Sequence, residues 1–192
     1  MKKELILGVV ALGALALLQP VAVSANDSGE SEAYVTIKQS PTPTGELKFT
    51  DIKTNAHITF EDTTINGTNQ TAEEKVKGTA KVKIADTRSG VATGKTGAYT
   101  VTIKDVTLAT EALSFINNDL KLNINSSDNG KGTHNHSSVA VSTAEQTVFT
   151  GVYEAGVNEH EVVLNPTLDI PSALTNAGDY FSKLEWTLTP EV

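Results

Sequence analysis

The chain has 192 residues, of which 20% are charged, and its formal net charge is −8 at pH 7. Nucleic acid and anionic membranes are poor partners for such an acidic chain, because their phosphates repel it. Cysteine is absent, so that disulfides are excluded and the fold has to rest on burial and hydrogen bonding.

The first 25 residues have the features of a secretory signal peptide. Lys2 and Lys3 give a positive start, residues 5–18 form an apolar run, and residues 23–25 are the small residues of a cleavage site. The apolar run is shorter than the roughly 20 residues that span a bilayer, which disfavours the alternative of an uncleaved anchor. Cleavage after Ala25 leaves 167 residues with a net charge of −9. We therefore expect a secreted protein without a membrane span.

The secreted part is predicted to consist of a disordered leader, residues 26–32, and one domain, residues 33–190. The leader is short, polar and acidic. The C-terminal residues contain neither a Leu-Pro-x-Thr-Gly sequence nor a second apolar segment, so we expect the folded domain itself to hold the protein on a surface.

The domain is predicted to be all-β, because apolar residues alternate with polar ones along most of it. The clearest example is residues 75–85, followed by residues 99–104, 120–125 and 180–189. About nine such strands without βαβ spacing predict an antiparallel β-sandwich, Ig-like in general architecture. Residues 109–118 are expected to form a helical turn or two. The polar segment 126–138 is predicted to be a long loop.

The last predicted strand carries a distinctive row of apolar side chains on one face. Tyr180, Leu184, Trp186 and Leu188 share this face, and Trp186 is the only tryptophan of the chain. The row resembles the distal motif of the WxL domain family, an aromatic residue followed by Leu-x-Trp-x-Leu near the chain end.

The region that would correspond to the proximal WxL motif is degenerate. It follows Asp86-Thr87-Arg88 and a glycine-rich turn, and reads Tyr99-Thr100-Val101. Tyr99 and Val101 keep an aromatic and an aliphatic residue on one face, but the tryptophan and the leucine of the family are missing. The two motifs and the opening strands extend the resemblance over about residues 33–190.

The resemblance implies a surface protein of Gram-positive bacteria that attaches non-covalently to the cell wall. The expected ligand is peptidoglycan or another wall polymer, and the expected protein partner is a WxL-interacting surface protein. The alternative is an adhesion subunit that binds host extracellular matrix or that partner and contacts the wall only indirectly. No cofactor is expected.

The motif residues and a row of lysines each have two interpretations. Alternation favours a core role for Trp186 over a role as an exposed binding residue. Lys75, Lys77, Lys81 and Lys83 lie on the polar face of the strand predicted at residues 75–85. They are a candidate anion stripe, although a solvated or edge-strand face is the more common explanation.

Other polar residues give weaker indications. His134 and His136 are a weak metal-ligand pair in a predicted loop, with Asp128 as the nearest carboxylate, and no metal site is predicted. Asp86 and Arg88 are predicted to form a structural ion pair. No nucleophile, metalloprotease or phosphate-loop motif is present in the sequence, so we expect no enzymatic activity.

Overall fold

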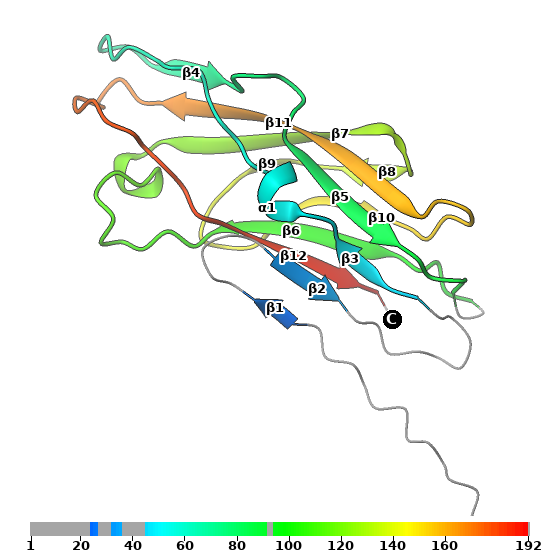
Figure 1. Ribbon diagram of the computed structural model, residues 1–192. Helices are drawn as coiled ribbons and strands as arrows, with labels where there is room; N and C mark the ends of the chain where they lie inside the picture. The colour runs from blue at the N-terminus through cyan, green and yellow to red at the C-terminus, as the bar shows by residue number, and fades with distance from the viewer. Residues whose placement is uncertain (1–23, 27–31, 36–44, 92–93, 192) are drawn as a thin grey trace, which may run out of the picture.

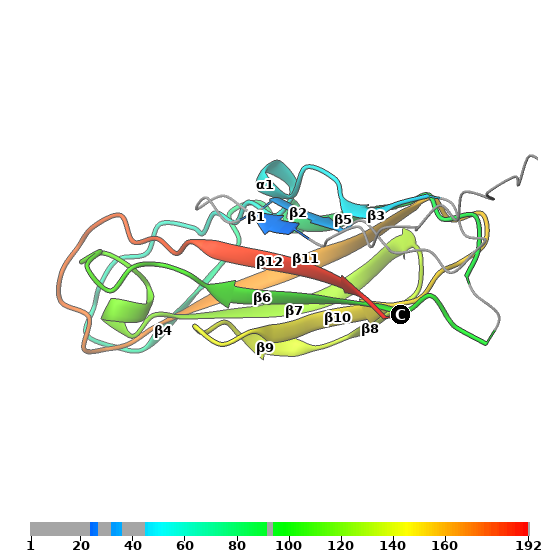
Figure 2. The same ribbon diagram turned by 90° about the horizontal axis from the view of Figure 1, so that it is seen from below.

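The computed structural model describes residues 24–26, 32–35, 45–91 and 94–191, and its strands form two antiparallel sheets packed face to face (Figures 1 and 2). This arrangement confirms the predicted antiparallel β-sandwich. The predicted signal peptide falls mainly outside the described residues. One strand ends at Asn26, the first residue of the predicted leader, and the next strand begins at Glu32, its last residue. Residues 27–31 lie outside the described part.

The first sheet has the order β1-β2-β3-β5-β11-β7-β9. Its central strand β11 pairs with β7 along most of its length, while β5 and then β4 share its other side. The strands of this sheet are β1 (Ser24–Asn26), β2 (Glu32–Val35), β3 (Leu47–Phe49), β4 (Gln70–Glu73), β5 (Lys81–Asp86), β7 (Lys121–Lys131), β9 (Ser138–Ala140) and β11 (Glu159–Ile170).

The second sheet has the order β12-β6-β10-β8. Its strands are β6 (Tyr99–Asp105), β8 (His134–His136), β10 (Gln146–Gly151) and β12 (Leu184–Pro190). The register of β6 and β12 sets Ile103 opposite Trp186 and Val101 opposite Leu188. The proximal and distal motifs therefore lie on neighbouring strands.

Helical structure in the described residues is confined to single turns. The helix α1 (Ile52–Asn55) lies against the first sheet, with Ile52 buried. The 3₁₀ helix η1 (Ile116–Asn118) lies within the segment for which a helical turn was predicted, and this confirms that expectation. Among the described residues, no helix combines the length and apolar composition that crossing a bilayer requires.

One cluster of buried side chains joins the two sheets. In β5 and β6 every second residue is buried, so the period-two pattern predicted from sequence is confirmed there. The largest fully buried side chains of the cluster include Trp186, Tyr99, Phe149, Leu47, Ile84, Ile103, Ile124, Leu164 and Leu188. At about 25 cal/mol per Å² of apolar surface, burial of this kind is the main stabilising contribution in a chain that lacks disulfides.

Three expectations about strands were wrong in detail. The strand predicted from Lys75 begins at Lys81, because a turn occupies residues 75–78 and leaves Val76 exposed. In β10, a register shift between Thr147 and Phe149 places Val148 and Phe149 both in the core, where strict alternation predicted opposite faces. The strand predicted from Tyr180 begins at Leu184.

The predicted loop 126–138 is largely strand. β7 continues to Lys131, paired with β11, and the chain then crosses to the second sheet, where β8 pairs with β10. Polar residues form strands here because neighbouring strands satisfy their backbone groups, a contribution that does not depend on side-chain hydrophobicity. This correction matters because it places His134 and His136 on a strand.

Candidate functional site

A large cleft opens at one end of the sandwich. Three connections meet there: the segment between α1 and β4, the segment between β6 and β7, and the segment between β11 and β12 (Figures 1 and 2). The cleft has a volume of about 1160 Å³. Its walls come from these connections, and its floor comes from the ends of β7, β11 and β12.

The floor of the cleft is apolar. The floor includes Leu120, Leu122, Leu168 and Trp186. Each of these residues is almost completely buried. Phe60, from the segment between α1 and β4, and Phe115, from the segment between β6 and β7, pack against each other, with ring centroids 6.3 Å apart and the planes tilted by 57°. An apolar ligand surface would therefore find aromatic and aliphatic contacts along the cleft.

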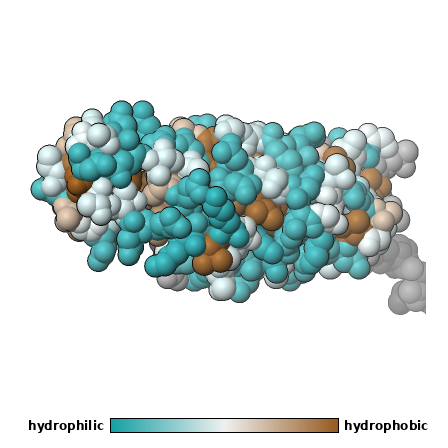
Figure 3. Space-filling model, turned by 90° about the horizontal axis from the view of Figure 1, so that it is seen from above, coloured by the Kyte–Doolittle hydropathy of each residue, from teal (hydrophilic) through white to brown (hydrophobic). Residues whose placement is uncertain are grey.

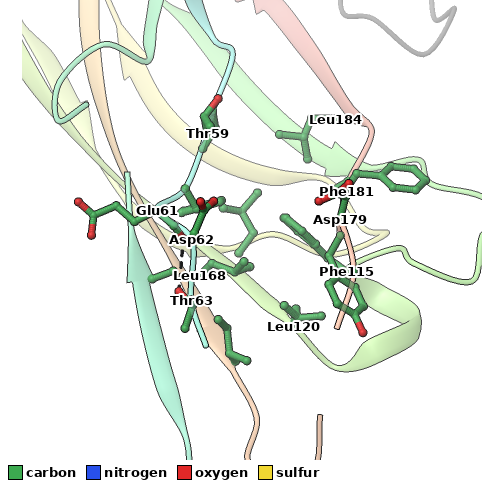
Figure 4. Close-up of a pocket in the computed structure, with 18 of the residues that line it drawn as sticks. Thr59, Glu61, Asp62, Thr63, Phe115, Leu120, Leu168, Asp179, Phe181 and Leu184 are labelled. Carbon is green, nitrogen blue, oxygen red and sulfur yellow. Dashed lines mark hydrogen bonds between the residues drawn. The ribbon is translucent and has the colours of Figure 1, made fainter. Parts of the chain in front are cut away.

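The rim of the cleft is polar and carries groups of both charges. Figure 4 shows Thr59, Glu61 and Asp62 on one wall and Asp179 on the facing wall, with Leu168 between them. Phe181 also borders the cleft, but its ring points away from the facing wall and is 38% exposed. Lys53 and Lys183 also line the cleft, so the opening has only a small excess of negative charge, and its carboxylates can accept hydrogen bonds from amines or hydroxyl groups.

The distal motif divides between the cleft and the core. Tyr180, Leu184 and Trp186 line the cleft, whereas Leu188 is fully buried between the sheets. The hydroxyl group of Tyr180 donates a hydrogen bond of 2.6 Å to the carbonyl oxygen of Asn176. Trp186 is only 2% exposed, in agreement with the core role that alternation predicted, and it also forms part of the cleft floor.

The proximal motif lies outside the cleft. Tyr99 and Val101 are fully buried on β6, and Val101 faces Leu188 across the strand pair. Burial, and the nearby carboxylate of Asp86, raise the pKa of Tyr99 above its ordinary value. The hydroxyl group of Tyr99 therefore stays protonated and acts as a hydrogen-bonding group.

The four lysines considered as a candidate anion stripe do not lie on one strand. Lys75 and Lys77 lie in the turn before β5, and Lys77 pairs with Glu73 at 2.5 Å. Lys81 and Lys83 lie on β5 and surround the carboxylate of Glu161, at 2.9 and 3.6 Å. The hydrogen bond and charge of Lys81 lower the pKa of Glu161 to about 2. Glu161 therefore compensates part of the charge of these two lysines within the fold.

A cluster of histidines lies at the opposite end of the sandwich, where β5 and β7 end and β11 begins (Figure 1). Here the structure brings together His134, His136 and Asp128, which the sequence analysis regarded as a weak ligand set. One ligand atom from each of them lies within 4.8 Å of the other two. The side chain of His134 is fully buried, and those of His136 and Asp128 are 23% and 37% exposed.

Buried aromatic rings hold this cluster in place. The ring of His134 makes edge contacts with Phe149 at 5.3 Å and with His160 at 5.4 Å between centroids. Gly151 lies under these rings, and a Cβ atom there would come within 2.4 Å of the Tyr99 ring and 2.9 Å of His134. A side chain at this position would displace both rings.

The predicted Asp86–Arg88 ion pair is confirmed at the same end. Arg88 donates from Nε and Nη2 to the two carboxylate oxygens at 2.7 and 2.5 Å, and from Nη1 to the carbonyl oxygen of Gly97 at 3.0 Å. Burial raises the pKa of Asp86, but the hydrogen bonds and charge of Arg88 outweigh it and hold this pKa at about 2. His160 lies behind the pair, with Nε2 3.6 Å from Asp86, and is fully buried.

The fold places the chain in the class of antiparallel β-sandwich proteins. No protein-family model matches the chain, and neither a curated protein nor a solved structure matches it. Function is therefore argued from the cleft and from the motif residues that line it.

Proposed function

We propose that the protein is a secreted, non-enzymatic surface protein that attaches to the Gram-positive cell wall by binding peptidoglycan in the cleft. The observation that carries this proposal is the position of the distal motif. Tyr180, Leu184 and Trp186 line the cleft, and Trp186 connects its floor to the core. The residues that resemble the WxL motif would then form the binding site and stabilise the strand that supports it.

The size of the cleft favours a polymer over a small molecule. Pockets for small ligands usually have volumes of about 300–1000 Å³. The cleft, at about 1160 Å³, exceeds this range and is open to solvent between its two walls. A segment of a long chain can enter such an opening from the side without threading an end.

The chemistry of the cleft suits peptidoglycan in two ways. Its aromatic and aliphatic residues, among them the packed rings of Phe60 and Phe115, offer apolar surface to the faces of sugar rings. Its polar rim includes the carboxylates of Glu61, Asp62 and Asp179, which offer partners to sugar hydroxyl groups and to the amines of peptide stems. The polymer supplies both kinds of group at short intervals.

The test is sedimentation of the purified full chain with purified cell wall. Phe60→Ala removes an aromatic ring from one wall of the cleft, and Leu184→Ala shortens a motif residue on the other. Each variant is expected to weaken wall binding by about tenfold, as expected for an anchor residue in a binding site. The matched control is Val152→Ala, an apolar residue 38% exposed at the other end of the sandwich, which should bind as the wild type does.

Thermal unfolding of each variant verifies that it is folded at the temperature of the assay. Release of bound protein by a chaotrope, without digestion of the wall, supports non-covalent attachment. Equal binding by the cleft variants and the wild type contradicts the proposal. Binding that requires an added surface partner supports the adhesion-subunit alternative, and soluble wall fragments would reveal a hydrolase.

A further inference from the structure

The histidine cluster has the geometry of a small ligand set. His134 and His136 are alternate residues of β8, and Asp128 lies near the end of β7. Oδ1 of Asp128 lies 2.6 Å from Nδ1 of His134 and 2.9 Å from Nε2 of His136. Two ring nitrogens from different residues thus converge on one carboxylate oxygen at the edge of the protein.

The hydrogen bonds around His136 fix which of its nitrogens carries a proton. The hydroxyl group of Ser126 donates to the carbonyl oxygen of Val148 at 3.0 Å, so its single proton is used. The 3.0 Å contact between Ser126 Oγ and His136 Nδ1 then requires that Nδ1 donates. With Nδ1 as donor, Nε2 of His136 faces the Asp128 carboxylate at 2.9 Å, a contact that either a proton or a metal ion between the two atoms would satisfy.

His134 is held in a similar way by its second nitrogen. Its Nε2 is 3.0 Å from the hydroxyl oxygen of Tyr99, a group that both donates and accepts. The ring therefore keeps its position whether Nδ1 carries a proton or presents a lone pair to Asp128. Hydrogen bonds of this kind to the outer nitrogen are a regular feature of metal-bound histidines.

We propose that Asp128, His134 and His136 bind a divalent transition-metal ion of the Zn²⁺ class. Two histidines and a carboxylate are a common set of three protein ligands for Zn²⁺, with water in the remaining position. Ligand atoms about 2.0–2.1 Å from a tetrahedral ion lie about 3.4 Å from one another. The separations of 2.6 and 2.9 Å need only a small outward shift, which the exposed side chains of Asp128 and His136 permit.

The metal would join the end of β7 to β8, and so join the two sheets at this end. Of the three ligands, His134 packs against the buried rings of Tyr99, Phe149 and His160. The proposed site is separate from the cleft, and it does not rest on the proposed wall-binding function.

Isothermal titration of the full chain with Zn²⁺, purified without a polyhistidine tag, tests the proposal. One ion is expected to bind per chain, and millimolar Mg²⁺, which prefers oxygen ligands, should not displace it. His136→Gln and Asp128→Asn should each weaken binding by at least about tenfold. His57→Gln is the matched control, because His57 is exposed and lies in the segment that borders the cleft.

A second pair of variants separates a metal site from a general loss of structure. Ser126→Ala and Tyr99→Phe remove the partners of the outer nitrogens and should weaken Zn²⁺ binding about 10- to 100-fold in a protein that is still folded. Circular dichroism verifies the fold of every variant. Zn²⁺ binding that is equal in the wild type, His136→Gln and Asp128→Asn overturns the proposal, as does the absence of saturable binding by the wild type.

Discussion

The two ends of the sandwich are built in different ways. At the cleft end, the walls are connecting segments that short turns and side-chain hydrogen bonds hold together, such as those from Asn117 and Asn118 to nearby carbonyl oxygens. At the histidine end, the residues of the cluster belong to strands that are paired along the sheets, and the side chains of His134 and His160 are fully buried. Strand pairing fixes side-chain direction closely, whereas connecting segments can move.

This difference corresponds to the ligands proposed for each end. A metal ion requires ligand atoms placed within tenths of an ångström, which rigid strands can supply. A polymer requires a long surface that adapts to its contour, which mobile segments can supply. The face seen in Figure 3, by contrast, is mostly hydrophilic, with apolar residues in separate small areas. That face has no broad apolar surface comparable to the floor of the cleft.

The largest expected effect tests the rigidity of the histidine end. Arg88→Ala leaves the buried carboxylate of Asp86 without its partner, and the carbonyl oxygen of Gly97 loses a hydrogen bond. The variant should lose about 3–5 kcal/mol of unfolding free energy in urea denaturation, as is usual when one member of a buried ion pair is removed. Lys131→Ala breaks an exposed pair with Glu159 and a longer contact of 3.7 Å with Glu161, and should lower the unfolding free energy by less than about 1 kcal/mol. Equal effects of the two variants would show that the buried Asp86–Arg88 pair contributes no more than an exposed pair at the same end of the sandwich.

A bound metal should stabilise the same end. At a Zn²⁺ concentration about 100 times the dissociation constant, binding to the native state alone contributes about 2.7 kcal/mol. For a chain of this size, that corresponds to an increase in Tm of about 5–10 °C. Differential scanning calorimetry should show this increase in the wild type and in Phe60→Ala, but not in His136→Gln. An increase that persists in His136→Gln would place the metal elsewhere.

The two ends also differ in how much of them the sequence could predict. Alternation in β5, β6 and β12 indicated the sandwich, because their inner faces are apolar and their outer faces polar. The Asp86–Arg88 pair was predictable because its two residues are close in the chain. The cleft was not, since its walls come from three segments that are distant in sequence and have no shared pattern.

The histidine cluster was hidden for a different reason. Residues 126–136 are almost entirely polar, so hydrophobic periodicity gave no sign of a strand there. The spacing of His134 and His136, two residues apart around Asn135, was a usable signal, because alternate residues of a strand share a face. The hydrogen bond between Ser126 and His136 depends in turn on the hydrogen bond from Ser126 to the carbonyl oxygen of Val148, 22 residues away. No local sequence pattern indicates a contact between residues so far apart.

The pH dependence of stability should also originate away from the cleft. The pKa values of Asp86 and Glu161 are held at about 2, below those of the unfolded chain. Each carboxylate therefore contributes stability that is complete above about pH 5 and is lost as the pH falls toward 2. Shifts of this size are worth about 2–3 kcal/mol per group.

Urea denaturation of Glu161→Gln measured between pH 7 and pH 2 isolates one of these contributions. The variant should be less stable than the wild type at pH 7, because Lys81 and Lys83 lose their shared carboxylate. The difference should shrink as the pH falls below about 4, where the wild-type carboxylate begins to lose its advantage. A constant difference across this range would show that the charge of Glu161 is not the cause.

The smallest expected effect concerns the segment that carries one wall of the cleft. Asn118 donates from Nδ2 to the carbonyl oxygens of Ala112 and Ser114, both at 2.8 Å, and so closes the turn that precedes β7. Asn118→Ala should lower the unfolding free energy by only about 1 kcal/mol, since the site is half-exposed and water can replace the lost donor. Amide hydrogen exchange should nevertheless accelerate in residues 109–120 and stay unchanged in β8, because a local brace acts on local opening. Acceleration in β8 as well would mean that the two ends open together and that the rigid and the adaptable end are one cooperative unit.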